Sequence, residues 1–125
     1  MRGGLPLPDT KTYQGGCHCG RVRFRATTAI AELFECNCSI CSKRGALWAF
    51  VKAPQFELAQ GQDALADYQF GKKRIHHLFC ESCGIGSYSQ GLAPNGEETF
   101  AINARCIDDL DVTALPRKPF DGKKL

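Results

Sequence analysis

The chain has 125 residues, of which 43% are hydrophobic and 23% are charged, and its formal net charge is +3. This length fits one domain, and the composition is that of a folded globular protein and argues against a disordered chain. No apolar run approaches the roughly 18 residues that a membrane span needs, and residues 1–8 lack the apolar core of a signal peptide. We therefore expect one domain over residues 1–125, no membrane partner, and a cytosolic or nuclear location, with the cytoplasm preferred.

Short strands punctuated by glycine dominate the pattern after a loose leader over residues 1–12. Val22, Phe24 and Ala26 alternate with arginines, which predicts a strand with one buried and one solvated face. Further strands are expected at residues 32–35, 46–51, 56–58, 66–70, 74–79, 85–90 and 99–104. Residues 108–115 should form one or two helical turns, and 116–125 an extended tail. Strands at this spacing predict a mainly β fold, a sandwich or barrel with its core over residues 13–112.

The eight cysteines are the unusual part of the composition, because seven of them lie in tight clusters. The clusters are Cys17-x-Cys19, Cys36-x-Cys38-x-x-Cys41 and Cys80-x-x-Cys83, and Cys106 stands alone. In a reducing compartment such spacing indicates metal binding rather than disulfides. Zinc binds thiolates, so the loaded protein would have a net charge near zero. The basic composition is therefore poor evidence for a nucleic-acid partner.

The spacing of the clusters predicts two zinc ions per chain. Cys80 and Cys83 form a zinc knuckle, and Cys17 and Cys19 share one face of an extended segment, so the two pairs together can close a site with four thiolates. The middle cluster supplies only three thiolates, and three protein ligands with one open position is the arrangement of a catalytic zinc. The spacing leaves this division open. Further candidates for a fourth ligand are Cys106, His18, His76 and His77.

Simpler interpretations accompany these predictions. Both metal sites can be purely structural, and Cys106 can be an apolar filler on a late strand. One of His76 and His77 should point inward and the other outward, because neighbouring strand residues face opposite sides. Residues 72–74 should form a solvated turn, Trp48 and Phe50 should lie in the core, and the aspartates should begin a helix. These aspartates are Asp108, Asp109 and Asp111.

Together the motifs resemble the glutathione-dependent formaldehyde-activating enzyme family, which includes centromere protein V. The resemblance rests on three segments, to which residues 102–105 and 115–122 add support. The segments are Gly15-Gly16-Cys17-His18-Cys19-Gly20, Cys36-Asn37-Cys38-Ser39-Ile40-Cys41 and Phe79-Cys80-x-x-Cys83-Gly84. The family implies a β-rich fold of packed antiparallel sheets around zinc. It also implies a structural zinc on the first and last clusters, and a catalytic zinc on Cys36, Cys38 and Cys41.

The activity that this resemblance implies is a carbon–sulfur lyase that joins formaldehyde, or a related small aldehyde, to the thiol of glutathione. Glutathione carries two carboxylates, which calls for cations near the second zinc. Lys43 and Arg44 follow Cys41 closely and are the candidates for glutathione binding. The alternative is a non-enzymatic zinc module that binds a protein or nucleic acid, as the centromere member suggests. Such a module would be expected to carry a long basic or disordered extension for recruiting its partner. Only about a dozen loose residues precede Tyr13 here, so we prefer a small-molecule role.

Overall fold

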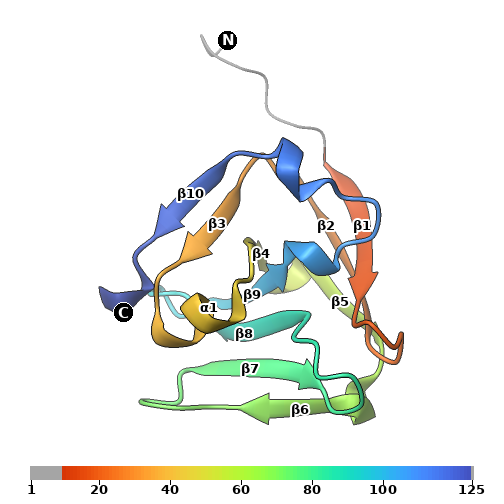
Figure 1. The fold of residues 1–125 in the computed structure, drawn as a ribbon, viewed down its shortest axis with the longest axis horizontal. Helices are drawn as coiled ribbons and strands as arrows, with labels where there is room; N and C mark the ends of the chain where they lie inside the picture. Colours follow the sequence, from red (N-terminus) through yellow and green to blue (C-terminus); the bar gives the residue numbers. More distant parts are fainter. Residues whose placement is uncertain (1–9, 125) are drawn as a thin grey trace, which may run out of the picture.

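Two β-sheets form the body of the protein in a computed structural model that describes residues 10–124. The smaller sheet has the order β1-β2-β5, with strands Lys11–Gly16, Arg23–Thr28 and Phe56–Gln60. The larger sheet has the order β10-β3-β4-β9-β8-β7-β6 (Figure 1). Its strands are Arg117–Phe120, Leu33–Cys36, Trp48–Lys52, Glu98–Asn103, Tyr88–Leu92, Ile75–Cys80 and Leu65–Tyr68. This architecture confirms the mainly β prediction.

The smaller sheet follows from the alternation seen in the sequence. Phe24 and Ala26 of β2 are buried, whereas the arginine side chains between them lie at the surface. Arg25 pairs with Glu57 of β5 at 3.1 Å. Strand β1 already begins at Lys11, which pairs with Thr28, so the expected leader is two residues too long. Residues 1–9 of that leader lie outside the described part of the chain.

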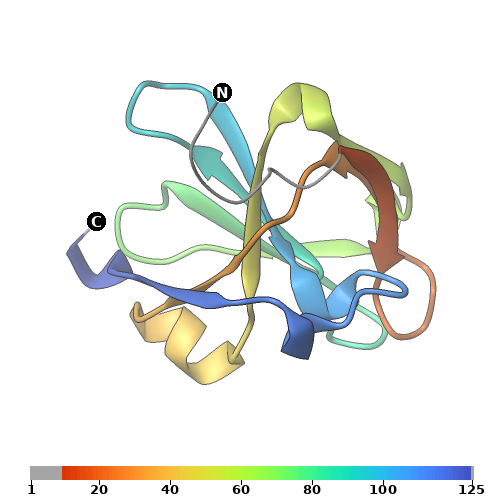
Figure 2. The same cartoon turned by 90° about the horizontal axis from the view of Figure 1, so that it is seen from above.

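The larger sheet is mixed rather than wholly antiparallel. Its strand pairs are antiparallel except that the tail strand β10 runs parallel to β3, with Phe120 opposite Cys36. The expected extended tail is therefore a strand over Arg117–Phe120, followed by a 3-10 turn at Gly122–Lys124. Residue 125 lies outside the described residues. Figure 2 shows the C-terminal segment beside the turn that leads from β3 into the short helix α1 (Ser39–Arg44).

The core lies where the two sheets pack together. Phe24, Leu33 and Ile102 are among its most deeply buried side chains. Phe56 of β5 stacks on Phe100 of β9, with ring centroids 4.3 Å apart, and so joins the sheets directly. A second group of buried residues contains Cys17 and Cys80 and adjoins this core. Burying one large apolar side chain contributes about 1.5–3 kcal/mol, so this packing holds both sheets in place around the cysteines.

Several local expectations need correction. Helix α1 falls on residues for which no helix was predicted. Trp48 is buried as expected, but Phe50 is 40% exposed, with only the rings of Phe34 and Phe120 packed against its own among the described aromatic side chains. Residues 85–87 are not strand, since β8 begins at Tyr88.

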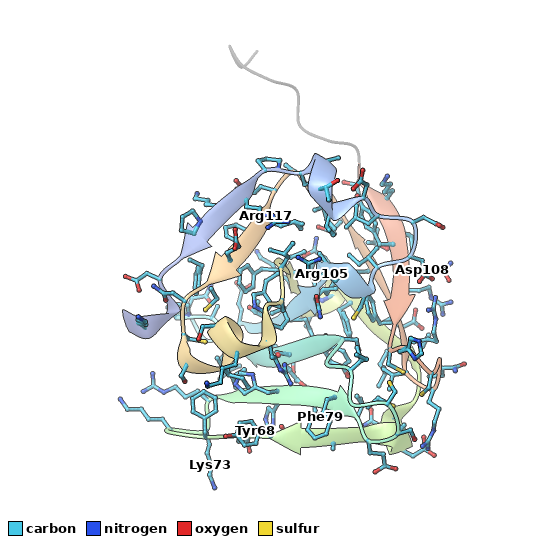
Figure 3. The ribbon with its side chains drawn as sticks, viewed as in Figure 1. Tyr68, Lys73, Phe79, Arg105, Asp108 and Arg117 are labelled. Carbon is cyan, nitrogen blue, oxygen red and sulfur yellow. The ribbon has the colours of Figure 1, made fainter. Side chains whose placement is uncertain are left out.

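The region after β9 also differs from the predicted helix. Residues 108–115 form one 3-10 turn, at Val112–Ala114, and no α-helical turn, and Asp111 caps the 3-10 turn by accepting the N–H of Thr113 at 3.0 Å. Asp108 instead pairs with Arg23 of β2. Cys106 ends another 3-10 turn rather than lying on a strand, and it packs against the core as an apolar filler. Residues 71–74 form the expected exposed turn, from which Lys73 extends away from the sheets (Figure 3).

Within residues 10–124, no helix is long and apolar enough to cross a membrane.

Candidate metal centres

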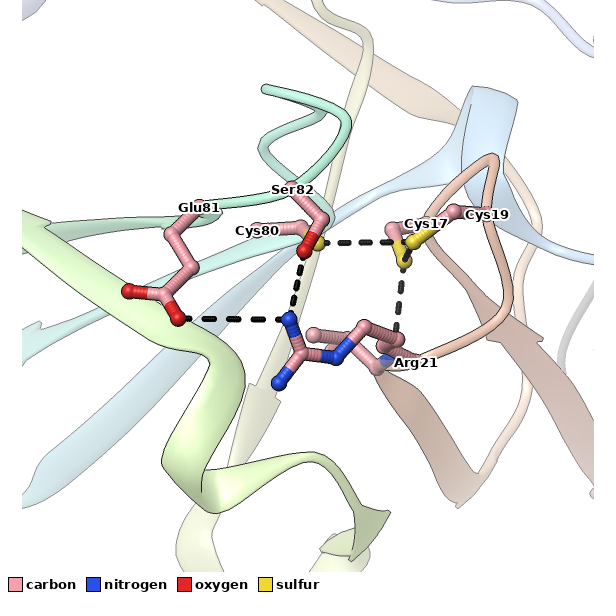
Figure 4. Close-up of polar contacts among 7 residues, drawn as sticks. Cys17, Cys19, Arg21, Cys80, Glu81 and Ser82 are labelled. Atoms are coloured by element: carbon pink, nitrogen blue, oxygen red, sulfur yellow. Dashed lines mark hydrogen bonds and ion pairs between the residues drawn. The ribbon is translucent and has the colours of Figure 1, made fainter.

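The first and last cysteine clusters meet in space, which is one of the arrangements that their spacing left open. Cys17 and Cys19 lie in the turn after β1, and Cys80 ends β7 (Figure 4). Cys83 lies in the turn that follows β7. The four sulfurs all lie within 4.8 Å of one another. Cys19 Sγ is 3.6 Å from both Cys17 Sγ and Cys80 Sγ. Four sulfurs bound to zinc at about 2.3 Å would be about 3.8 Å apart, so this arrangement fits a tetrahedral metal site.

Backbone N–H groups around the four-cysteine group favour the thiolate form that a metal requires. Val22 N–H donates to Cys17 Sγ at 3.3 Å. Burial raises the pKa of Cys17, but this N–H and the neighbouring thiols outweigh burial, and the pKa is lowered overall. The backbone N–H groups of Cys19 and then Ile85 lower the pKa of Cys83 to about 6. Hydrogen bonds to the charged form have this effect, so Cys17 and Cys83 are prepared for a cation. At Cys19 a backbone N–H lowers the pKa, but burial and the three neighbouring thiols outweigh it and raise the pKa to about 11.

Arg21 links the two halves of this group from the outside. Its guanidinium donates to the Ser82 hydroxyl and lies 3.9 Å from a carboxylate oxygen of Glu81 (Figure 4). Arg21 belongs to the turn that carries Cys17 and Cys19, and the other two residues lie between Cys80 and Cys83. These contacts are exposed and contribute little stability. They nevertheless orient one turn against the other.

The middle cluster forms a second group, with three sulfurs. Cys36 ends β3, Cys38 caps α1, and Cys41 lies inside that helix. Their sulfurs lie within 4.8 Å of one another. Among the residues described, no fourth cysteine, histidine or carboxylate joins this group. It therefore fits a metal site with three protein ligands and one position left for another ligand.

The short helix brings these three sulfurs together. Cys38 Sγ accepts the N–H of Cys41 at 3.5 Å and so acts as the N-cap. Gly45 then ends the helix in a left-handed conformation, and its N–H donates to the Cys41 carbonyl at 2.9 Å. One helical turn thus places Cys38 and Cys41 on the same side, next to the end of β3. The sequence does carry a signal for the end of this helix: basic residues in the last turn, Lys43 and Arg44, followed directly by Gly45.

Burial dominates the electrostatics of the second group. It raises the pKa of Cys36 and of Cys41. Burial also raises the pKa of Cys38, but the N–H of Cys41 and the neighbouring thiols lower it overall. Three thiolates this close together repel one another unless a cation lies between them. The donor set thus suits a soft divalent metal such as zinc.

Two buried donors beside the second group have no hydrogen-bond partner among the described residues. They are Arg44 Nη1 and Trp48 Nε1. Arg44 is half-buried, and its guanidinium packs on Gly86, where a Cβ would come within 3.0 Å of it. Burial lowers the pKa of Arg44, and the Cys41 thiol opposes this shift. Lys43, the other predicted cation, is exposed on the same helix.

The remaining candidates for a fourth ligand lie outside both groups. His76 binds the Asp67 carboxylate at 2.6 Å and faces outward. His77 is only 6% exposed, and its ring stacks on Phe70 at 5.3 Å, so the prediction of one inward and one outward histidine is confirmed. His18 is exposed, and Cys106 joins neither group.

Two comparisons relate the chain to known proteins. The family model described as glutathione-dependent formaldehyde-activating enzyme matches residues 12–120. A protein of Rhodobacter sphaeroides with a crystal structure is similar in sequence and fold, with 28% identity and a TM-score of 0.73. That match covers 84% of this chain and 99% of the Rhodobacter chain.

Proposed function

Because the chain belongs to the glutathione-dependent formaldehyde-activating enzyme family, we propose that it adds formaldehyde, or a related small aldehyde, to the thiol of glutathione. The observation that carries this proposal is the difference between the two cysteine groups. One offers four sulfurs, and the other offers three beside unpartnered buried donors. A closed site and an open site have different roles in zinc proteins.

In this proposal each group holds one zinc ion. Cys17, Cys19, Cys80 and Cys83 hold the structural ion, which ties the turn after β1 to the end of β7. Cys36, Cys38 and Cys41 hold the ion at which substrate binds. All eight cysteines are free thiols, which suits a reducing compartment, and we place the protein in the cytoplasm.

The reaction joins the thiol sulfur to the aldehyde carbon. The carbon–oxygen double bond becomes a single bond, and the proton of the thiol passes to the oxygen, giving a hydroxymethyl thioether. A bound zinc ion would supply the positive charge that lowers the pKa of a substrate thiol. The three cysteines supply a negative, polarisable set of ligands from the end of β3 and the first turn of α1. The N–H of Cys41 holds Cys38 Sγ at 3.5 Å, which keeps this turn in place during the reaction.

Arg44 is the residue that we assign to binding a negative group of the substrate. Its Nη1 is buried without a partner, and an unpaired buried donor costs about 1–3 kcal/mol until it finds an acceptor. A carboxylate of glutathione would be such an acceptor, and the fork of an arginine suits it. Lys43 is exposed, and we assign it a weaker, long-range attraction for the same anion.

Exchange spectroscopy by NMR tests this function. Formaldehyde and glutathione combine without a catalyst, so the measurement must compare exchange rates rather than product amounts. We expect the wild-type protein to accelerate exchange between free glutathione and its hydroxymethyl adduct, and Cys41→Ser to remove this acceleration. Unchanged exchange with a protein that carries both metal ions would contradict the enzymatic function and favour a non-enzymatic zinc module.

A further inference from the structure

The C-terminal segment after β10 lies against the loop that carries Cys36 and Cys38. Strand β10 pairs in parallel with β3, so that Phe120 lies opposite Cys36, and the N–H of Asn37 donates to the Phe120 carbonyl at 3.2 Å. Both ribbon views place the 3-10 turn after β10 beside the turn between β3 and α1 (Figures 1 and 2). The two ends of this contact are more than 80 residues apart in the chain. A long-range contact of this kind costs loop-closure entropy, and so the contact needs favourable interactions to persist.

The side chain of Asn37 provides two such interactions. Its amide nitrogen donates to Asp121 Oδ1 at 2.9 Å, and its amide oxygen accepts the backbone N–H of Lys123 at 3.0 Å. Asn37 lies between two of the three cysteines, so these bonds fix the backbone that carries them. Together they hold the C-terminal segment and the cysteine loop in one register.

Gly122 makes the closest approach to the sulfurs. A Cβ added there would come within 3.0 Å of Cys36 Sγ, a separation that real Cβ atoms do not show, and would lie 3.2 Å from Cys38 Cβ. The backbone of Gly122 is not in the left-handed region, so glycine is needed here for space rather than for conformation. The C-terminal segment therefore acts as one wall of the three-cysteine group.

We propose that Gly122 and Asn37 are positioning residues for the metal held by Cys36, Cys38 and Cys41, and that docking of residues 120–123 and metal binding stabilise each other. A methyl group at 122 displaces Cys36 Sγ from its place among the three sulfurs. Loss of the Asn37 amide frees the segment and loosens the same loop. The coupling is reciprocal, so metal bound by the three cysteines must in turn hold the segment in place. This inference rests on the proposed function only in requiring that the three-cysteine group binds a metal.

The test compares zinc release from four variants by a colorimetric chelator, with the zinc content measured first. Gly122→Ala and Asn37→Ala are the test variants. We expect each to lose one zinc ion about 10–100-fold faster than wild type, the usual cost of removing a group that supports metal ligands. The matched controls are Gly91→Ala, where the nearest atom to a Cβ belongs to the Ile75 side chain at 3.3 Å and no backbone atom lies closer than 3.5 Å, and Lys123→Ala, which keeps the backbone N–H bond. Both controls should release zinc like wild type.

Two further measurements need no activity assay. With Co²⁺ in place of zinc, the thiolate charge-transfer absorption of one site should weaken in Gly122→Ala and persist in Gly91→Ala. Hydrogen exchange of residues 117–124 should slow when the second metal is added to wild type, and this slowing should be absent in Gly122→Ala. A melting temperature close to that of wild type shows that a variant is folded. If Gly122→Ala fails to fold, Asn37→Ala still tests the inference, because it removes a side-chain amide and adds no bulk. If the wild type holds two zinc ions and all four variants release them at the wild-type rate, this inference is wrong and the proposed function is unaffected. If the wild type holds only one ion, the proposed second metal site is itself wrong.

Discussion

The Cys80→Ser variant tests the structural role of the four-cysteine group. Cys80 is fully buried at the end of β7, and its sulfur meets that of Cys19, which is 61 positions away in the chain. The metal acts as a cross-link that closes a loop of this length. The conformational entropy that such a cross-link removes from the unfolded chain is worth about 4 kcal/mol at 25 °C. A whole domain has only about 5–15 kcal/mol of stability. Losing this closure should therefore remove a large part of the free energy of unfolding.

The expected loss translates into a large shift in melting temperature. For a domain of this size, about 1 kcal/mol corresponds to a shift of about 3–5 °C, so Cys80→Ser should melt at least about 12 °C below wild type or fail to fold. Circular dichroism melts of freshly purified, reduced proteins provide the measurement. Metal analysis of the same samples should find that the zinc of this site is lost.

The matched control for this prediction is Cys106→Ser. Cys106 is partly buried and likewise changes from thiol to hydroxyl, but it belongs to neither cysteine group. We expect a loss of about 1 kcal/mol and a shift of a few degrees, as is usual for a single substitution. If Cys80→Ser melts cooperatively as close to wild type as Cys106→Ser does, with both zinc ions retained, the structural assignment is wrong.

Three other predictions follow from the same geometry. Native mass spectrometry of reduced wild-type protein should find two zinc ions per chain, and a single ion or a disulfide would show that the cysteines are used differently. Cys41→Ser should stay folded, retain about one zinc ion and lose the acceleration of exchange; retention of both ions would place Cys41 outside the second site. Arg44→Ala should raise the KM for glutathione about 10–100-fold, because a hydrogen bond between charged groups contributes about 1.5–3 kcal/mol, while Lys43→Ala should have a smaller effect. An unchanged KM in Arg44→Ala would remove that residue from the substrate site.

Much of the candidate site was predictable from the sequence because its ligands come in short local motifs. The Cys80-x-x-Cys83 knuckle and the Cys36-to-Cys41 stretch each place several sulfurs together through one turn of backbone. The alternation of Val22, Phe24 and Ala26 likewise fixes which face of β2 is buried, without any information from distant residues.

Other features depend on contacts between distant segments, and the sequence carries no local signal for them. The parallel pairing of β10 with β3 joins the tail to the middle cluster, and the neighbours of Gly122 cannot be read from its own position. Helix α1 has six residues and is capped by a cysteine, so it lacks both the length and the usual cap of a predictable helix. Phe50 was assigned to the core from its hydrophobicity, although its neighbours Ala49 and Val51 occupy the buried face.

A time course of zinc release tests most directly the central claim, that the chain holds one closed and one open metal site. A site with four protein thiolates exchanges slowly, whereas a site with three has a position at which an external thiol or chelator can enter. With a mild chelator, or with glutathione at millimolar concentration, we predict two phases: one zinc ion leaves quickly, and the remaining protein with one ion still melts cooperatively near the wild-type temperature. Release of both ions in a single phase, together with unfolding, would contradict the division into two sites and with it the case for an open catalytic zinc.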